Sequence, residues 1–322
     1  MSPEVFVKLL AIFAVVAIGW GAAKSGRLGA EEGSRVLSAA AFYVFVPALL
    51  FRTTARIDFH RLDVRVVVAF FVPTLALVAV VYTALRVRAR AGAAAAEPSV
   101  RAITSAFGNA VQIGIPLAAA LFGEAGLALH LTVVGLHSLT LLTVLTALVE
   151  LDLARANPGA GSARLLRTLA TTVRNTVIHP VVLPVLAGLA WNLSGLALPG
   201  LVDEILATLG QAVVPVCLVL IGVSLAHYGV RGALRAATLL AALKLAVHPL
   251  AVLVFARFAV GLDGVALAIV VMLAALPVGS NALIFAQRYR TLPGETSTAI
   301  VVSTLAFVVT APLWLAILHV TG

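Results

Sequence analysis

The feature that most constrains this chain is a series of apolar runs, most of them close to the length of a membrane span, that follow one another along almost the whole sequence. A run of about 18 or more residues with few charges can cross the ~30 Å hydrocarbon core of a bilayer as an α-helix. The backbone must satisfy its own hydrogen bonds there, and the alternating segments of a β-barrel are absent from the sequence. Only 11% of the residues are charged, against about 25% in a soluble domain. The sequence therefore predicts an all-α integral membrane protein.

The runs predict ten transmembrane helices. Their expected spans are 5–23, 36–52, 64–86, 101–122, 125–148, 176–195, 202–227, 233–256, 264–287 and 296–319. The first run ends in small residues, as a signal peptide does, but Glu4 precedes it and Lys24 and Arg27 follow it. This is the reverse of the charge order of a signal peptide. We therefore expect the first helix to be retained.

The basic residues indicate how the helices are oriented. Fifteen Lys and Arg residues fall on the side of the odd-numbered loops and six on the side of the N-terminus. Loops rich in Lys and Arg stay in the cytoplasm, so both termini are expected on the outer, periplasmic side. The bias toward Ala, Val and Arg indicates a bacterial chain, which places it in the cytoplasmic (inner) membrane. The net charge of +9 follows from these loops, so no nucleic-acid partner is expected.

The order of the prolines indicates that the chain is doubled. Prolines in the second, third and fourth helices recur in the seventh, eighth and ninth, as Pro47 and Pro215, Pro73 and Pro249, and Pro116 and Pro277. Five helices per half is an odd number, so the second half would enter the membrane from the opposite face, as in the inverted repeats of secondary transporters. The expected units are a first repeat at 1–149, a cytoplasmic loop at 150–175 and a second repeat at 176–322. The alternative is that proline is simply common in transmembrane helices.

Two segments interrupt helices near the centre of the bilayer. Residues 107–117 in the fourth helix and 276–289 in the ninth combine glycine, proline and amide side chains. Pro116 should free the carbonyl of Gln112 and break its helix. Such breaks are tolerated where they are buried or line a wet cavity, and half-helix N-termini can bind a carboxylate. The candidate crossover and substrate-binding residues are Asn109, Gln112, Gly114, Pro116, Pro277, Gly279, Ser280 and Asn281.

Lys244 lies near the middle of the eighth helix, where a lysine costs about 2.5–3.5 kcal/mol on insertion scales. It is a candidate for attracting an anionic substrate, or for a charge that replaces a proton or sodium ion and moves with the carrier. The structural alternative is a lysine tied to carbonyls loosened by a helix break. His248, one turn later, could share its cavity. In the fifth helix His137 is a pathway candidate near mid-membrane, whereas His130 is expected nearer the outer surface.

Several kinds of chemistry are missing from the sequence. No Asp or Glu lies in the middle of a predicted helix, so a sodium or proton site built on a buried carboxylate is not expected. The P-loop, GxSxG and HExxH motifs are absent, and the segment Gly222–Ala226 lacks the second glycine of a serine elbow, which suggests helix packing. Cys217 is the single cysteine. We expect no enzyme, no metal site and no cofactor, with proton coupling left open.

The segments GNAVQIGIPL (108–117) and ALPVGSNALIFAQRY (275–289) resemble the signature segments of the auxin efflux carrier family of permeases, whose bacterial members include malonate and other dicarboxylate carriers. The resemblance covers essentially the whole chain, although only these two segments are specific. It implies a fold like that of bile acid sodium symporters, with helices 4 and 9 crossing at their prolines. It also implies a scaffold of helices 1, 2, 6 and 7, which carries Pro47 and Pro215, and a mobile transport domain of helices 3–5 and 8–10.

The expected function is secondary active or facilitative transport of a small organic anion, a malonate-like mono- or dicarboxylate, by elevator-type alternating access. The rivals are a non-transporting receptor or sensor subunit, a sodium-coupled symporter of the bile acid type, a membrane enzyme and a channel. The missing mid-membrane carboxylates argue against sodium coupling, and the short segment 150–174 argues against auxin as the native substrate. A homodimer formed through the scaffold is left open.

Overall fold

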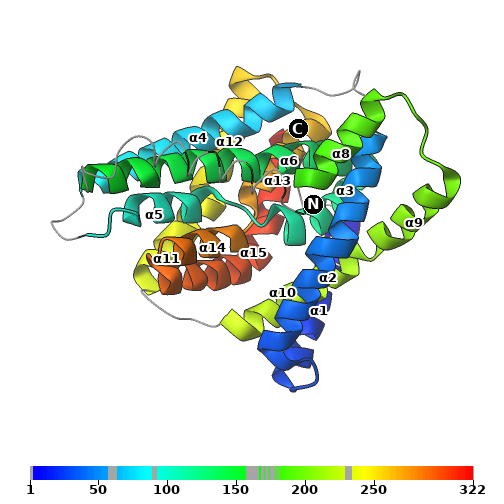
Figure 1. Ribbon diagram of the computed structural model, residues 1–322, viewed down its shortest axis with the longest axis horizontal. Coiled ribbons are helices and arrows are strands. Elements are labelled where there is room, and N and C mark those ends of the chain that lie inside the picture. The colour runs from blue at the N-terminus through cyan, green and yellow to red at the C-terminus, as the bar shows by residue number, and fades with distance from the viewer. Residues whose placement is uncertain are drawn as a thin grey trace.

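The computed structural model describes residues 3–56, 64–88, 93–156, 182–228 and 234–321 and the single positions 167, 170, 174, 178 and 180, and all the regular elements in this part are helices. Six helical segments are long and apolar enough to cross a membrane, and three shorter apolar helices accompany them. The all-α membrane class predicted from the sequence is therefore confirmed. In Figure 1, α1, α3, α8, α9 and α10 lie on one side of the molecule, and α4, α5, α11, α12 and α14 lie on the other.

The described part of the first half of the chain runs from α1 to α6, with a break between α5 and η4. The elements are α1 (Pro3–Lys24), η1 (Gly29–Gly33), α2 (Ser34–Ala40), η2 (Ala41–Phe45), α3 (Val46–Ala55), α4 (Val64–Val87), α5 (Glu97–Ala106), η4 (Ala110–Gly114) and α6 (Ile115–Ala156). The elements from Gly29 to Ala55 follow one another as one continuous helix. Inside α6 the backbone turns at Gly123, whose φ of 63° is readily adopted only by glycine.

The second half of the chain also contains long helices, with a break between α13 and α14. Its elements are α8 (Val182–Leu193), α9 (Gly200–Gln211), α10 (Val213–Tyr228), α11 (Leu234–Ala242), η6 (Leu243–Val247), α12 (His248–Val254), η7 (Phe255–Ala259), α13 (Gly264–Ala275), α14 (Ser280–Arg288) and α15 (Pro293–Thr321). The predicted start of the sixth helix at 176 and most of the predicted loop at 150–175 lie outside the described residues.

Two helices extend well beyond the ends that the sequence predicted. The second begins at Gly29 rather than 36, because Glu31 and Glu32 in its first turn complement the positive end of the helix dipole. The helix predicted to end at 148 continues to Ala156. There Asp152 is buried and pairs with Arg86 at 2.7 Å, so the polar residues that suggested a loop are held against α4.

Three prolines each follow a wide π-helical turn. The turns η2, η4 and η6 end two residues before Pro47, Pro116 and Pro249. A proline clashes with the carbonyl four residues earlier and gives it no hydrogen bond, so the wider turn relieves the clash. For Pro249 that carbonyl belongs to Leu245, and Trp314 Nε1 donates a hydrogen bond to it at 2.7 Å. The indole of α15 thereby satisfies a backbone group that lipid could not.

Glycines allow two helix pairs to approach closely. A Cβ atom on Gly19 of α1 would lie 2.4 Å from the carbonyl oxygen of Val219 in α10, and one on Gly222 would lie 2.0 Å from that of Val16. A Cβ on Gly188 of α8 would lie 2.6 Å from the carbonyl oxygen of Phe51 in α3. Small residues serve this purpose in membrane helix pairs, so the expected packing role of Gly222 is confirmed.

Candidate functional site

Two broken helices meet backbone to backbone inside the protein. The segment between α5 and η4 crosses the segment between α13 and α14, and Gly108 and Val278 form an isolated antiparallel bridge. Asn109 N donates to the Pro277 carbonyl at 2.8 Å, and Gly279 N donates to the Phe107 carbonyl at 2.9 Å. Each broken segment therefore satisfies backbone groups of the other. We call residues 107–109 and 276–279 the crossing.

The first break lies earlier in the chain than predicted. We expected it at Pro116, but the helix stops at Ala106, and Phe107 is extended with φ −78° and ψ 108°. Pro116 instead follows η4 in the first turn of α6, where its missing N–H is tolerated because the turn before it is wide. In the second half Pro277 does lie in the break.

Two half-helix N-termini face the crossing. Asn109 precedes η4, and its Oδ1 accepts a hydrogen bond from Gln112 N at 3.2 Å while its Nδ2 donates to Gln112 Oε1 at 3.1 Å. Ser280 is the first residue of α14. The N-terminal ends of helices carry partial positive charge and free N–H groups, so both new helices direct a favourable field for an anion toward the crossing.

Lys244 lies beside the two half-helix C-termini. Its side chain is fully buried, and its Nζ donates to the carbonyl of Ala274 at the end of α13. The same Nζ lies 3.4 Å from the point that a Cβ on Gly108 would occupy. A cation is stabilised at helix C-termini by the negative end of the dipole. The contact predicted by the structural alternative, a lysine tied to carbonyls at a break, is thus present.

Three histidines surround the crossing. The His137 ring packs against Phe107 with 4.3 Å between ring centroids and the planes tilted by 54°, and His248 Nε2 lies 2.8 Å from Thr74 Oγ1. His130 was expected near the outer surface, but only 2% of it is exposed and its Nε2 lies 2.8 Å from the Ala110 carbonyl oxygen. The helical periodicity of α6 places a histidine on a face but does not fix its depth, because the kink at Gly123 changes the course of the helix.

A polar cavity of about 620 Å³ opens between the crossing and the helices α2 and α10. Its wall on the crossing side includes Asn109, Gln112 and Ser280. The polar residues of the opposite wall and rim, which sequence reasoning missed, are Glu31, Ser34, Arg35, Ser38, Ser224, His227, Gln287 and Thr304. A volume of this size is typical of a small-molecule site, and the wall offers amide, hydroxyl and guanidinium donors suited to an anion.

The remaining predicted residues divide into two sets. Asn281, Gly279 and His137 line a smaller space of about 20 Å³ next to the crossing, together with Asn109 and Ser280. The remaining candidates line neither this space nor the polar cavity. They are Gly114, Pro116, Pro277, Lys244, His248, Pro47 and Pro215. A Cβ on Gly114 would lie 2.6 Å from the His130 ring, so that glycine allows close packing.

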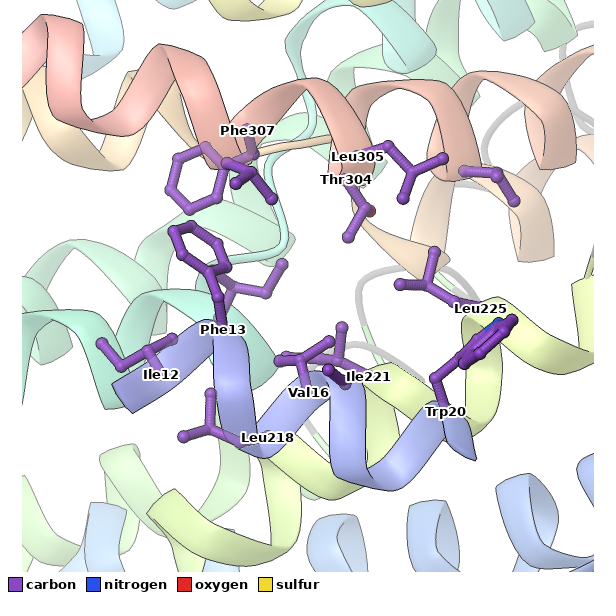
Figure 2. Close-up of a pocket in the computed structure, with 14 residues that line it drawn as sticks. Ile12, Phe13, Val16, Trp20, Leu218, Ile221, Leu225, Thr304, Leu305 and Phe307 are labelled. Atoms are coloured by element: carbon purple, nitrogen blue, oxygen red, sulfur yellow. The ribbon is translucent and has the colours of Figure 1, made fainter. Parts of the chain in front are cut away.

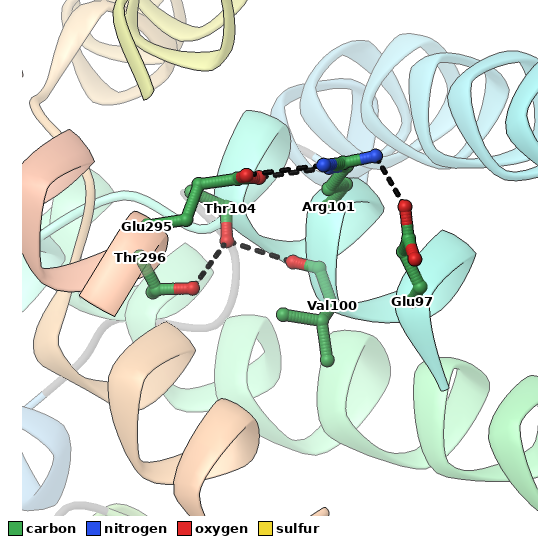
Figure 3. Close-up of polar contacts among 6 residues, drawn as sticks. All are labelled: Glu97, Val100, Arg101, Thr104, Glu295 and Thr296. Carbon is green, nitrogen blue, oxygen red and sulfur yellow. Dashed lines mark hydrogen bonds and ion pairs between the residues drawn. The ribbon is translucent and has the colours of Figure 1, made fainter. Parts of the chain in front are cut away.

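An ionic clamp holds α5 against α15 (Figure 3). Arg101 donates to both carboxylate oxygens of Glu295, at 2.8 and 3.0 Å, and to Glu97 Oε1 at 2.5 Å. One turn deeper, Thr104 Oγ1 lies 3.4 Å from Thr296 Oγ1. Bidentate pairs of arginine and carboxylate fix geometry as well as charge. The clamp therefore fixes the half-helix that leads into the first break.

Comparison with known proteins identifies the family. Residues 4–315 match the family model described as "Membrane transport protein". An "Uncharacterized transporter" of Methanothermobacter thermautotrophicus is 25% identical over 310 residues, 96% of this chain and 97% of that protein. A "Putative malonate transporter" of Rhizobium meliloti is 24% identical over 270 residues, 83% of this chain and 82% of that protein. Together with the apolar helices, the match over nearly the whole length shows that this chain is a multi-pass protein of the membrane transport protein family, the family that the resemblance to auxin efflux carriers predicted.

Proposed function

We propose that this chain is a secondary active or facilitative transporter of a small organic anion, a mono- or dicarboxylate of the malonate type. The observation that carries the proposal is the polar cavity of about 620 Å³, which has the crossing on one side and α2 and α10 on the other. The Rhizobium meliloti relative, 82% of which aligns with this chain, is named a putative malonate transporter.

The lining suits a carboxylate for three reasons. The N-termini of η4 and α14 present partial positive charge at Asn109 and Ser280. Arg35 supplies a guanidinium on the opposite wall, where Glu31 also lies, and a guanidinium can hold a carboxylate through two hydrogen bonds. Lys244, buried behind the crossing, adds to the positive field although its Nζ is bonded to Ala274.

Transport would follow from movement of one helix group past the other. We propose a scaffold of α1, α2, α3, α8, α9 and α10 and a mobile group of α4 to α6 and α11 to α15. The paired packing supports this division, because α1 lies along α10 through Gly19 and Gly222 while α3 lies along α8 through Gly188. In an inverted repeat of five helices, the first helix corresponds to the sixth and the second to the seventh. The pair of the first and seventh helices, α1 and α10, is then equivalent to the pair of the sixth and second helices, α8 and α3.

The cavity also suggests which state of the carrier this structure represents. Arg35, His227 and Gln287 lie at its rim, near the ends of α2, α10 and α14. The distribution of basic residues assigns these helix ends to the cytoplasm. We therefore propose that the site faces inward here, with both chain termini on the periplasmic side of the inner membrane.

Uptake of radiolabelled malonate into proteoliposomes tests the assignment. Asn109→Ser keeps a side-chain oxygen to cap η4 but removes the amide, and Asn281→Ala removes the second amide. Asn192→Ala is the matched control, because Asn192 Nδ2 donates to the Ala55 carbonyl at 2.9 Å between α8 and α3. We expect both site variants to lose uptake while the control retains it. Uptake at the wild-type rate in both site variants would refute the site assignment. Sodium and pH gradients applied in turn would identify the coupling ion.

A further inference from the structure

A second, apolar cavity lies between α1, α10 and α15 next to Ile113 of η4, and it shares Ile221, Leu225 and Thr304 with the lining of the polar cavity. Its volume is about 310 Å³ (Figure 2). Side chains from the three helices point into a common space, and the labelled ones are Ile12, Phe13, Val16, Trp20, Leu218, Ile221, Leu225, Thr304, Leu305 and Phe307. The one hydroxyl among the lining side chains, that of Thr304, already donates to the Ile300 carbonyl at 2.7 Å. Apart from the indole N–H of Trp20, the cavity therefore offers water almost nothing to bind.

An apolar space of this size favours a hydrocarbon occupant. A cavity of about 150 Å³ lined by apolar side chains stays dry and takes up benzene, and this one is about twice as large. The pair Phe13 and Phe307, at 6.4 Å between ring centroids, joins α1 to α15 at its deep end. From Ile12 to Trp20 the cavity follows α1 for about 12 Å at ~1.5 Å per residue. It is thus elongated along a transmembrane helix.

The cavity opens sideways, toward the bilayer. Trp20 is 47% exposed, Leu305 60% and Val308 44%, and all three line the cavity. Leu305 and Val308 lie on α15, which is long and apolar enough to cross a membrane, and Trp20 lies on the shorter apolar stretch Leu10–Lys24, so lipid hydrocarbon would meet their exposed surfaces in a membrane. Bilayer lipid is consequently the one apolar species always present at the opening.

We propose that this cavity is a lipid site that takes one acyl chain of a bilayer phospholipid between α1, α10 and α15. The chain enters through the gap between Trp20 and Leu305 and reaches inward to the Phe13 and Phe307 pair. Because α15 belongs to a different proposed helix group from α1 and α10, the chain would fill the interface between the groups. Lipid binding itself does not depend on what the polar cavity transports.

Photolabelling in nanodiscs tests the site. The probe is a phospholipid that carries a diazirine midway along one acyl chain, added at a low mole fraction, and labelled residues are located by mass spectrometry. Leu218 and Phe307 line the cavity but are only 4% and 2% exposed, whereas Ile18 and Val309 are 67% and 63% exposed and lie outside it. Surrounding lipid labels the second pair, and only a chain inside the cavity can label the first.

The control variants use equivalent substitutions on one helix. Ala17 lines the cavity and Ala14 does not, and both are exposed on α1. We expect label on Leu218 and Phe307 in the wild type and in Ala14→Phe, and a several-fold loss of it in Ala17→Phe with the label on Ile18 and Val309 unchanged. The unchanged lipid-facing label shows that the variant is folded. Label confined to Ile18 and Val309, or label on Leu218 and Phe307 that Ala17→Phe leaves unchanged, would overturn the proposal. Displacement of that label by malonate would also overturn it, by assigning the cavity to the substrate.

Discussion

The backbone nitrogen of Asn109 donates a hydrogen bond to the carbonyl oxygen of Pro277 at 2.8 Å. The two residues are far apart in the sequence, and each lies at the break of its own helix. Together with the return bond from Gly279 N to the Phe107 carbonyl, this pair locks the two breaks into one unit. The properties of the candidate site depend on that unit, because it positions both half-helix N-termini.

Gly279→Val should disrupt the crossing. A Cβ at this position would lie 2.7 Å from the carbonyl oxygen of Gly108, which is backbone and cannot move aside. Overpacking of this kind costs about 1–3 kcal/mol, so we expect a lower melting temperature in detergent and loss of uptake. Gly21→Ala is the control, because a Cβ there meets nothing within 4 Å. A Gly279→Val protein as stable and active as the wild type would show that the crossing does not need this close approach.

Trp314→Phe should destabilise the fold more than Trp191→Phe does. Trp314 Nε1 satisfies the Leu245 carbonyl, and a buried carbonyl left without a partner costs about 1–3 kcal/mol. Trp191 Nε1 has no hydrogen-bond partner among the described residues, so its removal costs packing alone. Unfolding in denaturant measures both free energies. Equal losses in the two variants would mean that the Leu245 carbonyl gains little from the indole.

The ionic clamp should show strong pairwise coupling. Arg101 and Glu295 are 24% and 5% exposed in their side chains, and removal of one partner leaves a largely buried charge, which costs about 3–5 kcal/mol in buried pairs. A double-mutant cycle with Arg101→Gln and Glu295→Gln measures the coupling free energy. The exposed pair of Arg35 and Glu32, at 4.0 Å, is the control and should give a value near zero. The prediction fails if the two cycles give the same coupling.

Lys244→Met should weaken anion transport while the fold is kept. Methionine has a similar length and suits an apolar core, so the variant removes one charge and the donor to the Ala274 carbonyl while the packing is kept. At an effective dielectric constant of about 20, a unit charge about 10 Å from an anion contributes about 1.7 kcal/mol, which corresponds to roughly a twenty-fold increase in KM. Uptake kinetics measure this change, and the melting temperature serves as the fold control. An unchanged KM would leave Lys244 with only its bond to the Ala274 carbonyl.

The sequence predicted the broken helices because glycine, proline and asparagine at bilayer depth leave backbone groups that lipid cannot satisfy. It misplaced the first break, since Pro116 was expected to decide it and the extended residues at Phe107 and Gly108 do so instead. The wide turn η4 absorbs the proline. Local sequence shows where a helix can break, but the partner segment at Val278 determines which residue becomes extended.

The far wall of the cavity was missed for a different reason. Ser34 and Arg35 were assigned to a loop because the second helix was expected to begin at 36, yet they lie on α2 and face the cavity. Ser34 Oγ lies 3.1 Å from Ser224 Oγ on α10, a long-range pairing that single-helix periodicity does not reveal. The amphipathic start of the second helix, with acids followed by Ser34, Arg35 and Ser38, is the signal that could have identified this wall.

A thermal-shift measurement of purified protein against a panel of mono- and dicarboxylates tests the central claim most directly. A ligand present at about 100 times its dissociation constant adds about 2.7 kcal/mol of apparent stability. We predict a clear shift with malonate or a related acid that is lost in the double variant Arg35→Gln and Asn109→Ser, which changes both walls of the cavity. Shifts absent with every carboxylate, or unchanged in the double variant, would contradict an anion site at the crossing.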